Sequence, residues 1–450
     1  MRIILLTFTV SCLIFVFVAC SENQSAVPTE TAVPPTATTE PTPTVTETVV
    51  APSTTTPTPS PTVPPPPTGQ IIYFWDPEYP LDNYGIEPYQ SLYLAQPGNS
   101  PTDWSITPIL SDLVGFPVVA LSPDQTKLAL TILEDRNNDG VTSFGSYERG
   151  GDDHNLYIYS LSDHSLKRLT DDYPTASYLS WSLDNQEITF PNDSFVLSYN
   201  LTTENLQILS ENHSGGVAQV TWSPAGGQLA FKLYSGSLYF LNKETNEVTQ
   251  PPDEAANLRT LGIAWSPDGK WLASNIFMGT GLVVVNSNDY ETFELIPQTF
   301  FGDYAWSPVS SDLAFVRFLR EGRASLEVAS AGDFVPKMLF EANSISSPVW
   351  TPDGSMITVG YMNEEESGML AFNPETGDYQ QLLQGNLEIE THPFVWSPDG
   401  EWLLFSQIHS EESGLYLIHR SGGEAYLFLD TTETFAPYSI VWLPENTVSP

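Results

Sequence analysis

The sequence predicts an all-β fold, a single β-propeller, from three observations. Tryptophans recur almost regularly from Trp181 to Trp442, with successive ones 41, 43, 41, 44, 46 and 46 residues apart. A tight turn and a short apolar strand follow most of them. The chain has 29 glycines and 38 prolines, and 12% of its residues are aromatic, as expected of many short strands joined by turns. Repeats of about 40–50 residues with four strands each are typical of propeller blades.

Each repeat begins with a tryptophan followed by Ser-Pro-Asp-Gly or a variant of it. The tryptophans are Trp181, Trp222, Trp265, Trp306, Trp350, Trp396 and Trp442. The Asp-Gly pair is intact at Asp268-Gly269, Asp353-Gly354 and Asp399-Gly400. Proline presets the φ angle of a turn and Asp-Gly tolerates positive φ, so the chain can reverse tightly. At Trp181 and Trp306 the motif is degenerate, and we expect this turn chemistry to be lost there.

The repeated tryptophans are interpreted as structural residues. Each ends an inner strand, as in 262–265, and its large ring can wedge between two neighbouring blades. The apolar segment after the turn, such as 271–274, forms the second strand, and two further strands complete the blade. The alternative function, an aromatic platform for carbohydrate, is disfavoured because tryptophan at the same place in every blade is more typical of core.

The two ends of the repeat region predict how the ring closes. Residues 71–75, 91–95 and 104–110 look like three strands of a blade without its inner strand, and 438–442 look like an inner strand alone. Pairing them would close the ring and remove its exposed edges. With seven complete motifs from Leu121 to Trp396, this predicts eight four-stranded blades. Seven is the alternative, if the blade at Trp181 or the N-terminal blade is irregular.

These repeats resemble the TolB-like, or PD40, propeller repeat, written W-S-P-D-G-x-x-L-A-F. The resemblance covers roughly residues 70–445 and is strongest at Trp265, Trp350 and Trp396. The Gly-His and Trp-Asp signature of WD40 repeats is absent. The resemblance implies a propeller that acts mostly in protein interaction, although the fold names no partner. We expect the propeller to span 69–445, with 446–450 as a tail.

The N-terminus resembles a bacterial lipoprotein signal peptide. Met1 and Arg2 precede an apolar run over 3–19, and Ala19 stands immediately before Cys20 as in a lipobox. The resemblance implies that 1–19 are removed and that Cys20 is lipidated. An uncleaved signal anchor is the alternative, because the apolar run nearly reaches the length that spans a bilayer. Both alternatives export the rest of the chain, which then faces the periplasm or the cell exterior.

Residues 20–68 are predicted to form a stalk that carries the lipidated Cys20 at its start. After that cysteine, proline, threonine, valine, alanine and serine dominate, and the segment has no apolar face to bury. It therefore cannot offset the entropy of ordering and stays unfolded. Dense proline makes such a chain stiff, with about 3.1 Å per residue and a reach of roughly 150 Å.

The formal charge is −40, from 55 acidic and 15 basic side chains. A surface this acidic repels phosphate backbones and anionic headgroups, so we expect no nucleic-acid binding and no membrane contact beyond the lipid anchor. It serves as a solubilising coat or attracts cations and basic partners.

The two cysteines are Cys12 and Cys20, which excludes disulfides and cysteine nucleophiles downstream. A monomer is expected.

The interval from Leu121 to Trp181 exceeds one repeat, and the excess contains a candidate calcium loop. Three oxygen side chains alternate along it and a glycine follows at the bend, as at positions 1, 3, 5 and 6 of an EF-hand loop. Ser146 occupies position 12, so the loop would need ligands from further along the chain. The candidate ligands are Asp135, Asn137, Asp139, the Val141 carbonyl, Glu148, Asp152 and Asp153. A solvated hairpin is the alternative.

No catalytic motif stands out in the sequence. It lacks a Gly-x-Ser-x-Gly elbow, and its six histidines show no metal-ligand spacing. We therefore predict a non-enzymatic binding or scaffold module for a protein, peptide or glycan. The alternatives are a glycan hydrolase or lyase with carboxylates at the mouth of the ring, and a passive spacer of the envelope.

Overall fold

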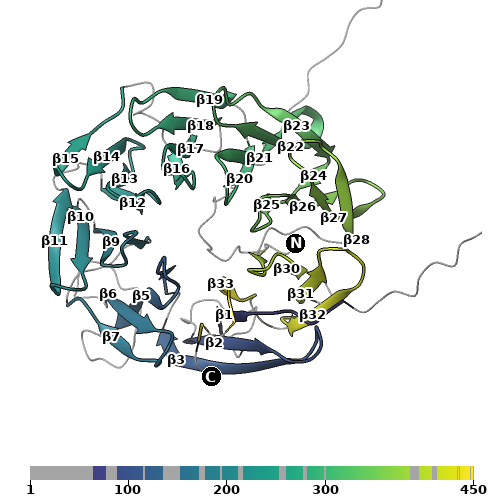
Figure 1. Cartoon of the computed structure of the whole chain (residues 1–450), viewed down its shortest axis with the longest axis horizontal. Helices are drawn as coiled ribbons and strands as arrows, with labels where there is room; N and C mark the ends of the chain where they lie inside the picture. Colours follow the sequence, from purple (N-terminus) through teal and green to yellow (C-terminus); the bar gives the residue numbers. More distant parts are fainter. Residues whose placement is uncertain are drawn as a thin grey trace, which may run out of the picture. The chain divides into compact units, whose positions relative to one another are not determined.

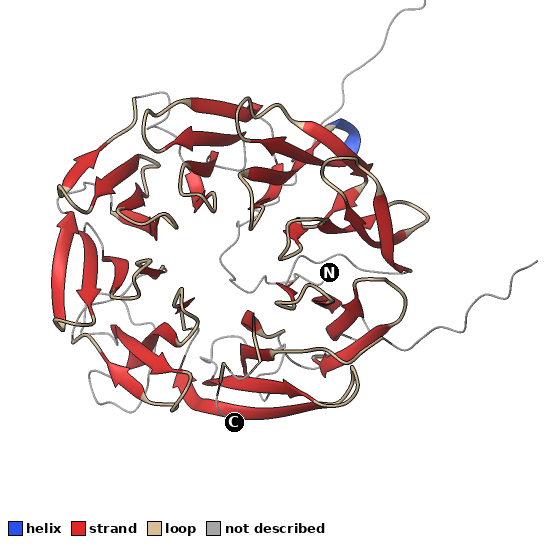
Figure 2. Ribbon diagram, viewed as in Figure 1, coloured by secondary structure: helices blue, strands red, loops and turns tan. Residues whose placement is uncertain are grey.

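The structure is a computed structural model that describes most of the repeat region. The described residues are 64–77, 89–114, 117–134, 153–171, 178–192, 195–210, 216–252, 260–276, 281–297, 301–385, 395–407, 413–432, 434, 436–445 and 447–448. Strands dominate them (Figure 2), and one short 3-10 turn, η2 (Arg320–Gly322), lies between two strands. No helix within these ranges is long and apolar enough to cross a membrane.

The strands form eight antiparallel sheets arranged as blades in a ring (Figure 1). We number the blades along the chain and give their strands from the axis of the ring outward. Blade 1 comprises β33 (Tyr438–Leu443), β1 (Gln70–Trp75), β2 (Tyr89–Pro97) and β3 (Trp104–Val114). Blade 2 comprises β4 (Val119–Leu121), β5 (Lys127–Glu134), β6 (Asp153–Ser160) and β7 (Leu166–Arg168). Blade 3 comprises β8 (Ser180–Trp181), β9 (Glu187–Asn192), β10 (Phe195–Asn200) and β11 (Asn205–Ser210).

The next three blades follow the same order. Blade 4 comprises β12 (Val217–Trp222), β13 (Gln228–Leu233), β14 (Leu238–Asn242) and β15 (Glu247–Thr249). Blade 5 comprises β16 (Thr260–Trp265), β17 (Trp271–Ile276), β18 (Gly281–Asn286) and β19 (Thr292–Pro297). Blade 6 comprises β20 (Phe301–Trp306), β21 (Asp312–Phe318), β22 (Ala324–Ser330) and β23 (Lys337–Ala342).

Blade 7 has a divided inner strand, because two short strands both pair with its second strand. It comprises β24 (Ser344–Ile345), β25 (Val349–Trp350), β26 (Ile357–Met362), β27 (Ser367–Phe372) and β28 (Tyr379–Gln384). Blade 8 comprises β29 (Val395–Trp396), β30 (Trp402–Gln407), β31 (Gly414–His419) and β32 (Ala425–Asp430). Eight sheets confirm the predicted blade number and exclude seven.

The core lies in the seams between blades. The middle strands of the blades are mainly apolar on both faces, and β18 and β27 are buried along their whole length. The reason is that neighbouring blades cover the two faces of each sheet. In the seam between blades 6 and 7, for example, Leu326 packs in one cluster with Trp350 and Val359. The outermost strands are mostly exposed, as in β7 and β28, and their sequences are correspondingly polar.

The ring closes as predicted, because the C-terminal strand β33 pairs antiparallel with β1 and completes blade 1. The register sets Ile71 opposite Trp442 and Ile72 opposite Val441. Beyond the predicted end of the propeller at residue 445, Val448 is 1% exposed. The side chain of Gln70 holds it, since the Val448 N–H donates to Gln70 Oε1 at 2.7 Å and Gln70 Nε2 donates to the Val448 carbonyl at 2.9 Å.

The two faces of the ring differ in the connections they carry. Strands alternate in direction within a blade, so the first-to-second and third-to-fourth connections lie on one face, which we call the turn face. The second-to-third connections and the links between blades lie on the other, the loop face. In blade 1 the chain enters β1 at Gln70 and leaves β33 at Leu443, both on the turn face. Both ends of the propeller therefore emerge from the turn face.

Candidate functional site

The repeated turn motif is built around a hydrogen-bonded serine and aspartate. In blade 5 the Ser266 hydroxyl donates to Asp268 Oδ1 at 2.5 Å and accepts the Trp271 N–H at 3.0 Å. Asp268 Oδ1 also accepts the Lys270 N–H at 3.1 Å. Gly269 has φ +66°, which relieves the strain that most side chains would meet at this bend. The motif is thus a self-contained turn that starts the second strand.

The same arrangement recurs in other blades, with one prediction overturned. Thr351 with Asp353, Ser397 with Asp399 and Ser122 with Asp124 reproduce the hydroxyl-to-carboxylate bond. We expected Trp181 to have lost this turn chemistry, and that prediction is wrong. Ser182 bonds to Asp184 at 2.6 Å, and Asn185 adopts φ +59° because asparagine tolerates this region better than most residues.

Blade 6 departs from the motif, as its sequence indicated. After Trp306 no residue from Ser307 to Asp312 has a positive φ angle. The Ser307 N–H donates to the Asp312 carbonyl at 2.8 Å, as the equivalent residues do in the other blades, but the hydroxyl-to-carboxylate bond runs from Ser310 Oγ to Asp312 Oδ2 at 2.6 Å. Val309 stands at this turn, exposed on the turn face.

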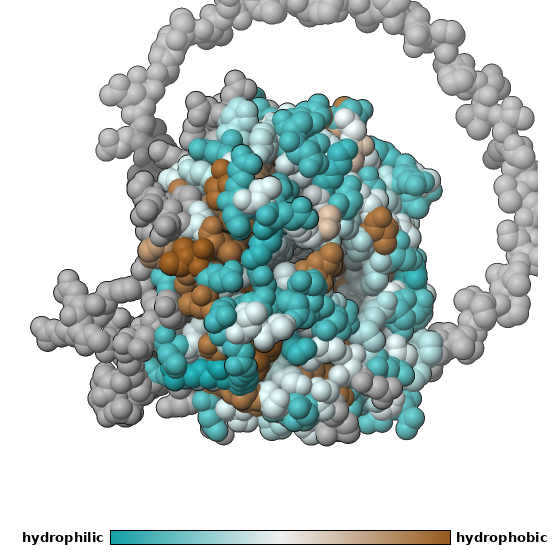
Figure 3. Space-filling model, turned by 60° about the vertical axis from the view of Figure 1, so that its left-hand side comes forward, coloured by the Kyte–Doolittle hydropathy of each residue, from teal (hydrophilic) through white to brown (hydrophobic). Residues whose placement is uncertain are grey.

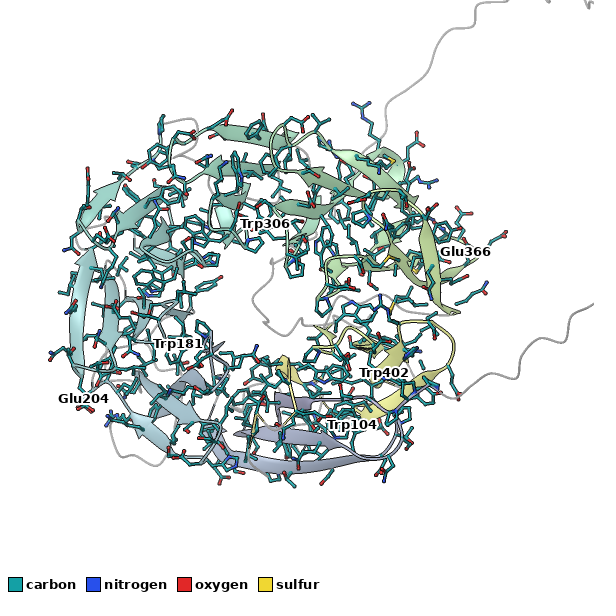
Figure 4. All side chains as sticks on the ribbon, in the orientation of Figure 1. Trp104, Trp181, Glu204, Trp306, Glu366 and Trp402 are labelled. Carbon is teal, nitrogen blue, oxygen red and sulfur yellow. The ribbon has the colours of Figure 1, made fainter. Side chains whose placement is uncertain are left out.

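Most repeat tryptophans connect their blade to the one before it. The indole N–H groups of Trp265, Trp306 and Trp350 donate to the backbone carbonyls of Thr221, Ala264 and Ala305, at 3.2, 3.0 and 2.9 Å. Trp181 bonds to Ala120 and Trp222 to Thr189 in the same direction around the ring. Trp442 instead bonds to Thr68, in the segment that leads into β1 of its own blade. All seven are buried except Trp306, which is partly buried. Trp181 and Trp306 lie on the inner side of the ring, whereas Glu204 and Glu366 lie at its outer rim (Figure 4).

Several turn-face carboxylates have pKa values below their usual range. Hydrogen bonds from the hydroxyls of Thr351 and Ser355 lower the pKa of Asp353 to about 2. Burial raises the pKa of Asp268, but hydrogen bonds from Ser266 and from the Lys270 N–H outweigh it, so the net shift is downward. Asp399 shows the same balance, with Ser397 as its main donor. These aspartates are therefore ionised acceptors at neutral pH.

The lowered pKa of Asp353 predicts a pH-dependent contribution to stability. A carboxyl whose folded-state pKa is near 2, against about 3.9 when unfolded, contributes stability that is present above about pH 4 and is lost as the pH falls towards 2. Asp353→Asn should therefore lower the free energy of unfolding at pH 7, and its difference from wild type should vanish near pH 2. Denaturant unfolding across this range measures both.

The control for this measurement is Asp378→Asn. Asp378 lies at an exposed turn of the same blade, and its carboxylate accepts no hydrogen bond from the described residues. A pH-dependent difference of the same size in the control would contradict the assigned role of Asp353.

The predicted lipidation and calcium residues fall mostly outside the described residues. Cys20 does, as do Asp135, Asn137, Asp139, Val141, Glu148 and Asp152. Asp153 begins β6, opposite Glu134 at the end of β5. Glu134 itself accepts bonds from Arg168 at 2.8 Å and Asn155 at 3.0 Å. In the described part of the chain, no group of three or more His, Cys, Asp or Glu side chains is placed to hold a metal ion.

The calcium loop stays a prediction, with a direct measurement. If 135–153 bind calcium weakly, as extracellular modules do at about 10⁻⁴–10⁻³ M, millimolar Ca²⁺ should raise the unfolding temperature and EDTA should reverse the effect. Magnesium at the same concentration serves as the control. An unchanged unfolding temperature in Ca²⁺ would favour the solvated hairpin.

A pocket of about 320 Å³, which the repeat pattern does not predict, opens on the turn face between blades 3 and 4. Its polar centre is an ion pair between Lys243 Nζ and Glu187 Oε2, 2.8 Å apart. Lys243 also lies over the ring of Trp222, with Nζ 5.9 Å from its centroid. One signal was available in the sequence: Glu187 stands six residues after Trp181, at the position that holds tryptophan in the repeats of Trp265 and Trp396.

Comparisons with known proteins identify the fold alone. No family model and no curated protein matches the chain. Dipeptidyl peptidase 4 of Porphyromonas gingivalis is 12% identical with a TM-score of 0.53, over 76% of this chain and 58% of that one. Oligogalacturonate lyase of Vibrio parahaemolyticus is 13% identical with a TM-score of 0.47, over 78% and 98%, and a structure of oligogalacturonate lyase in complex with manganese gives the same values.

A structure of TolB stands among the matches as well. The putative TolB of Agrobacterium tumefaciens is 15% identical with a TM-score of 0.37, over 66% of this chain and 99% of that one. The sheets, the ring closure and the similarity to the peptidase structure agree on the architecture. The chain is an eight-bladed β-propeller whose repeats resemble those of the TolB-like family.

Proposed function

We propose that this protein is an exported, lipid-anchored binding module whose propeller presents its loop face to a protein, peptide or glycan partner. The observation that carries the proposal is the difference between the two faces of the ring in the connections and chain ends that they carry. Gln70, where the chain enters β1, and Leu443, where it leaves β33, both lie on the turn face, so the loop face carries neither end of the ring. A partner on the loop face would therefore meet only the connections of the blades.

Large apolar side chains support the choice of the loop face. Tyr234, Phe318 and Met362 stand at second-to-third connections of blades 4, 6 and 7, and they are 69%, 38% and 42% exposed. Aromatic and methionine side chains are enriched in the buried centres of interfaces, where a few of them supply most of the binding energy. On the side drawn in Figure 3, hydrophobic residues form separate patches among hydrophilic ones. A partner on the loop face would contact several of these exposed apolar side chains at once.

The alternative of a glycan hydrolase would need a carboxyl group held protonated near neutral pH as a general acid. The turn-face aspartates have the opposite property. Hydrogen bonds lower the pKa values of Asp124, Asp268, Asp353 and Asp399, so they remain ionised. This favours binding over glycan hydrolysis for the described turn face, whereas a lyase needs a general base and is not disfavoured by these pKa values.

Chemical cross-linking on intact cells, followed by capture of the protein, tests the proposal. Wild type should recover a specific partner, and Tyr234→Ser with Phe318→Ser should reduce the recovery by about tenfold or more, because interface anchors contribute about 1–2 kcal/mol or more each. The matched control is Val309→Ser with Val335→Ser, two equally exposed apolar residues of the turn face. Equal loss in both variants, or no specific partner, would contradict the proposal.

The anchor is tested separately by Cys20→Ala. The variant should move from the membrane fraction to the soluble fraction, because without acyl chains nothing holds it to the bilayer. Retention of Cys20→Ala in membranes would favour the uncleaved signal anchor.

A further inference from the structure

Two residues leave the seam between blades 3 and 4 open. The position six residues after the start of the motif varies among the blades: it holds the almost fully buried Trp271 and Trp402 in blades 5 and 8, and Glu187 in blade 3. Five residues after Trp222, blade 4 has Gly227, and a side chain added there would meet nothing within 4 Å. A carboxylate and a glycine thus line this seam.

A chain of hydrogen bonds fixes the polar floor of this pocket. Glu187 Oε2 accepts from Lys243 Nζ at 2.8 Å and from Ser198 Oγ at 2.9 Å. Thr189 Oγ1 donates to Ser198 Oγ at 3.2 Å and accepts the indole N–H of Trp222 at 2.9 Å. The Glu187 and Lys243 side chains are 14% and 26% exposed, so both are partly withdrawn from water while still reaching the pocket. These hydrogen bonds hold Glu187 and Lys243 in place before any ligand binds.

Stability alone does not account for this arrangement. A partly buried ion pair pays a desolvation penalty that its attraction barely offsets, and apolar residues of similar volume often stabilise such a site more. Between blades 5 and 6, Trp271 and Ala331 occupy the places of Glu187 and Lys243. A hollow of about 390 Å³ lies there too, but it is lined mainly by exposed residues. The ion pair between blades 3 and 4 therefore indicates a role other than stabilising the fold.

We propose that this pocket binds one neutral sugar ring through adjacent hydroxyl groups. An ammonium group has three N–H donors, and Lys243 uses one of them for Glu187. Glu187 Oε1 accepts no hydrogen bond from the described residues, so the carboxylate keeps free acceptor sites beside a free donor. One hydroxyl can accept from Lys243 while its neighbour donates to Glu187. Leu183, exposed at the rim, offers an apolar surface to the C–H face of the ring.

Charge and volume both select this class of ligand. An anion at the free donor of Lys243 would lie beside the Glu187 carboxylate in a protein of net charge −40, and both repel it. A cation at the free acceptor of Glu187 would lie beside the Lys243 ammonium group, whereas a neutral polyol can use both groups without such repulsion. The volume of about 320 Å³ is at the low end for ligand pockets, which suits one ring-sized group. Because the pocket opens on the turn face, this site stands apart from the loop-face surface and does not depend on it.

Saturation-transfer NMR on the full-length protein tests the site with defined probes. We would use methyl β-glucoside, methyl α-mannoside and N-acetylglucosamine, with glucuronate and choline as charged comparisons. At least one neutral sugar should receive saturation at its ring protons, and the charged probes should not. Glu187→Gln, which keeps the shape but removes the charge pair, should weaken this signal about tenfold.

The sharpest control replaces the polar floor by the residues of the seam between blades 5 and 6. Glu187→Trp with Lys243→Ala copies Trp271 and Ala331, so it should remove both hydrogen-bonding groups, keep the protein folded, and abolish the sugar signal. Lys167→Ala, which breaks the exposed pair with Glu204, should leave the signal unchanged. The proposal is overturned if no neutral sugar binds, if charged probes bind better, or if the signal survives in the folded Glu187→Trp, Lys243→Ala variant.

Discussion

A chain that ends at Asp430 is expected to lose most of the stability of the propeller. The truncation removes Trp442, Leu443 and Val448, which are 6%, 0% and 1% exposed. Burying a large apolar side chain contributes about 1.5–3 kcal/mol, so three of them amount to about 5–9 kcal/mol. That range is comparable to the whole stability of a typical domain, about 5–15 kcal/mol. The truncation also leaves β1 as an open edge toward the axis, which invites aggregation.

A graded series of truncations separates the contributions of this closure. A chain ending at Val448 should unfold like the full chain, because it keeps every described contact of blade 1. A chain ending at Pro444 keeps β33 but loses the two bonds between Gln70 and Val448, so it should fall between the extremes. Thermal unfolding and limited proteolysis follow all three. An Asp430 truncation that unfolds at the temperature of the full chain would refute the closure.

Trp350→Ala is expected to lower the free energy of unfolding by about 3–5 kcal/mol, the usual effect of removing a buried aromatic ring. Trp350 is 6% exposed and fills the seam between blades 6 and 7 together with Leu326 and Ile357. Its indole N–H also donates to the Ala305 carbonyl at 2.9 Å. The residue therefore joins two blades by packing and by a hydrogen bond.

A matched pair of phenylalanine variants isolates the hydrogen bond. Trp396 is equally buried at the same repeat position, but its indole N–H has no hydrogen-bond partner in the described part of the chain. Both substitutions remove the same volume, and only Trp350→Phe also removes a hydrogen bond, which contributes about 0.5–1.5 kcal/mol. Trp350→Phe should thus be more destabilising than Trp396→Phe in denaturant unfolding. Equal effects would contradict a bond between blades.

The regular features of this fold were predictable from the sequence because each repeat carries its own local signals. Tryptophan spacing predicted the blades, and the two incomplete ends predicted the pairing of β1 with β33. Asn185 was misjudged because asparagine can replace glycine at positive φ, which a search for Asp-Gly does not detect. Val448 was placed in a tail because its burial depends on the side chain of Gln70, a contact between distant residues that no periodic pattern reveals.

The candidate sites were less accessible from the sequence. Glu187 and Lys243 come from different blades, so only the assembled seam brings them together. The single hint was Glu187 itself, an acidic residue at a repeat position that holds tryptophan in blades 5 and 8. The candidate calcium ligands differ from this pair, because they lie within one segment and their spacing can be recognised in the sequence. The calcium loop stays a prediction.

A pair of cysteines across the closing strands tests the closed eight-bladed ring most directly. In a chain with Cys12 and Cys20 changed to serine, Ile72→Cys with Val441→Cys sets two thiols at directly paired positions. Paired residues on antiparallel strands have Cα atoms about 4.5–5.5 Å apart, within disulfide range. Oxidation should give one linked peptide pair in the mass spectrum. Ile72→Cys with Leu443→Cys, two residues out of register, should link poorly, and equal or preferential linkage of this second pair would contradict the structure.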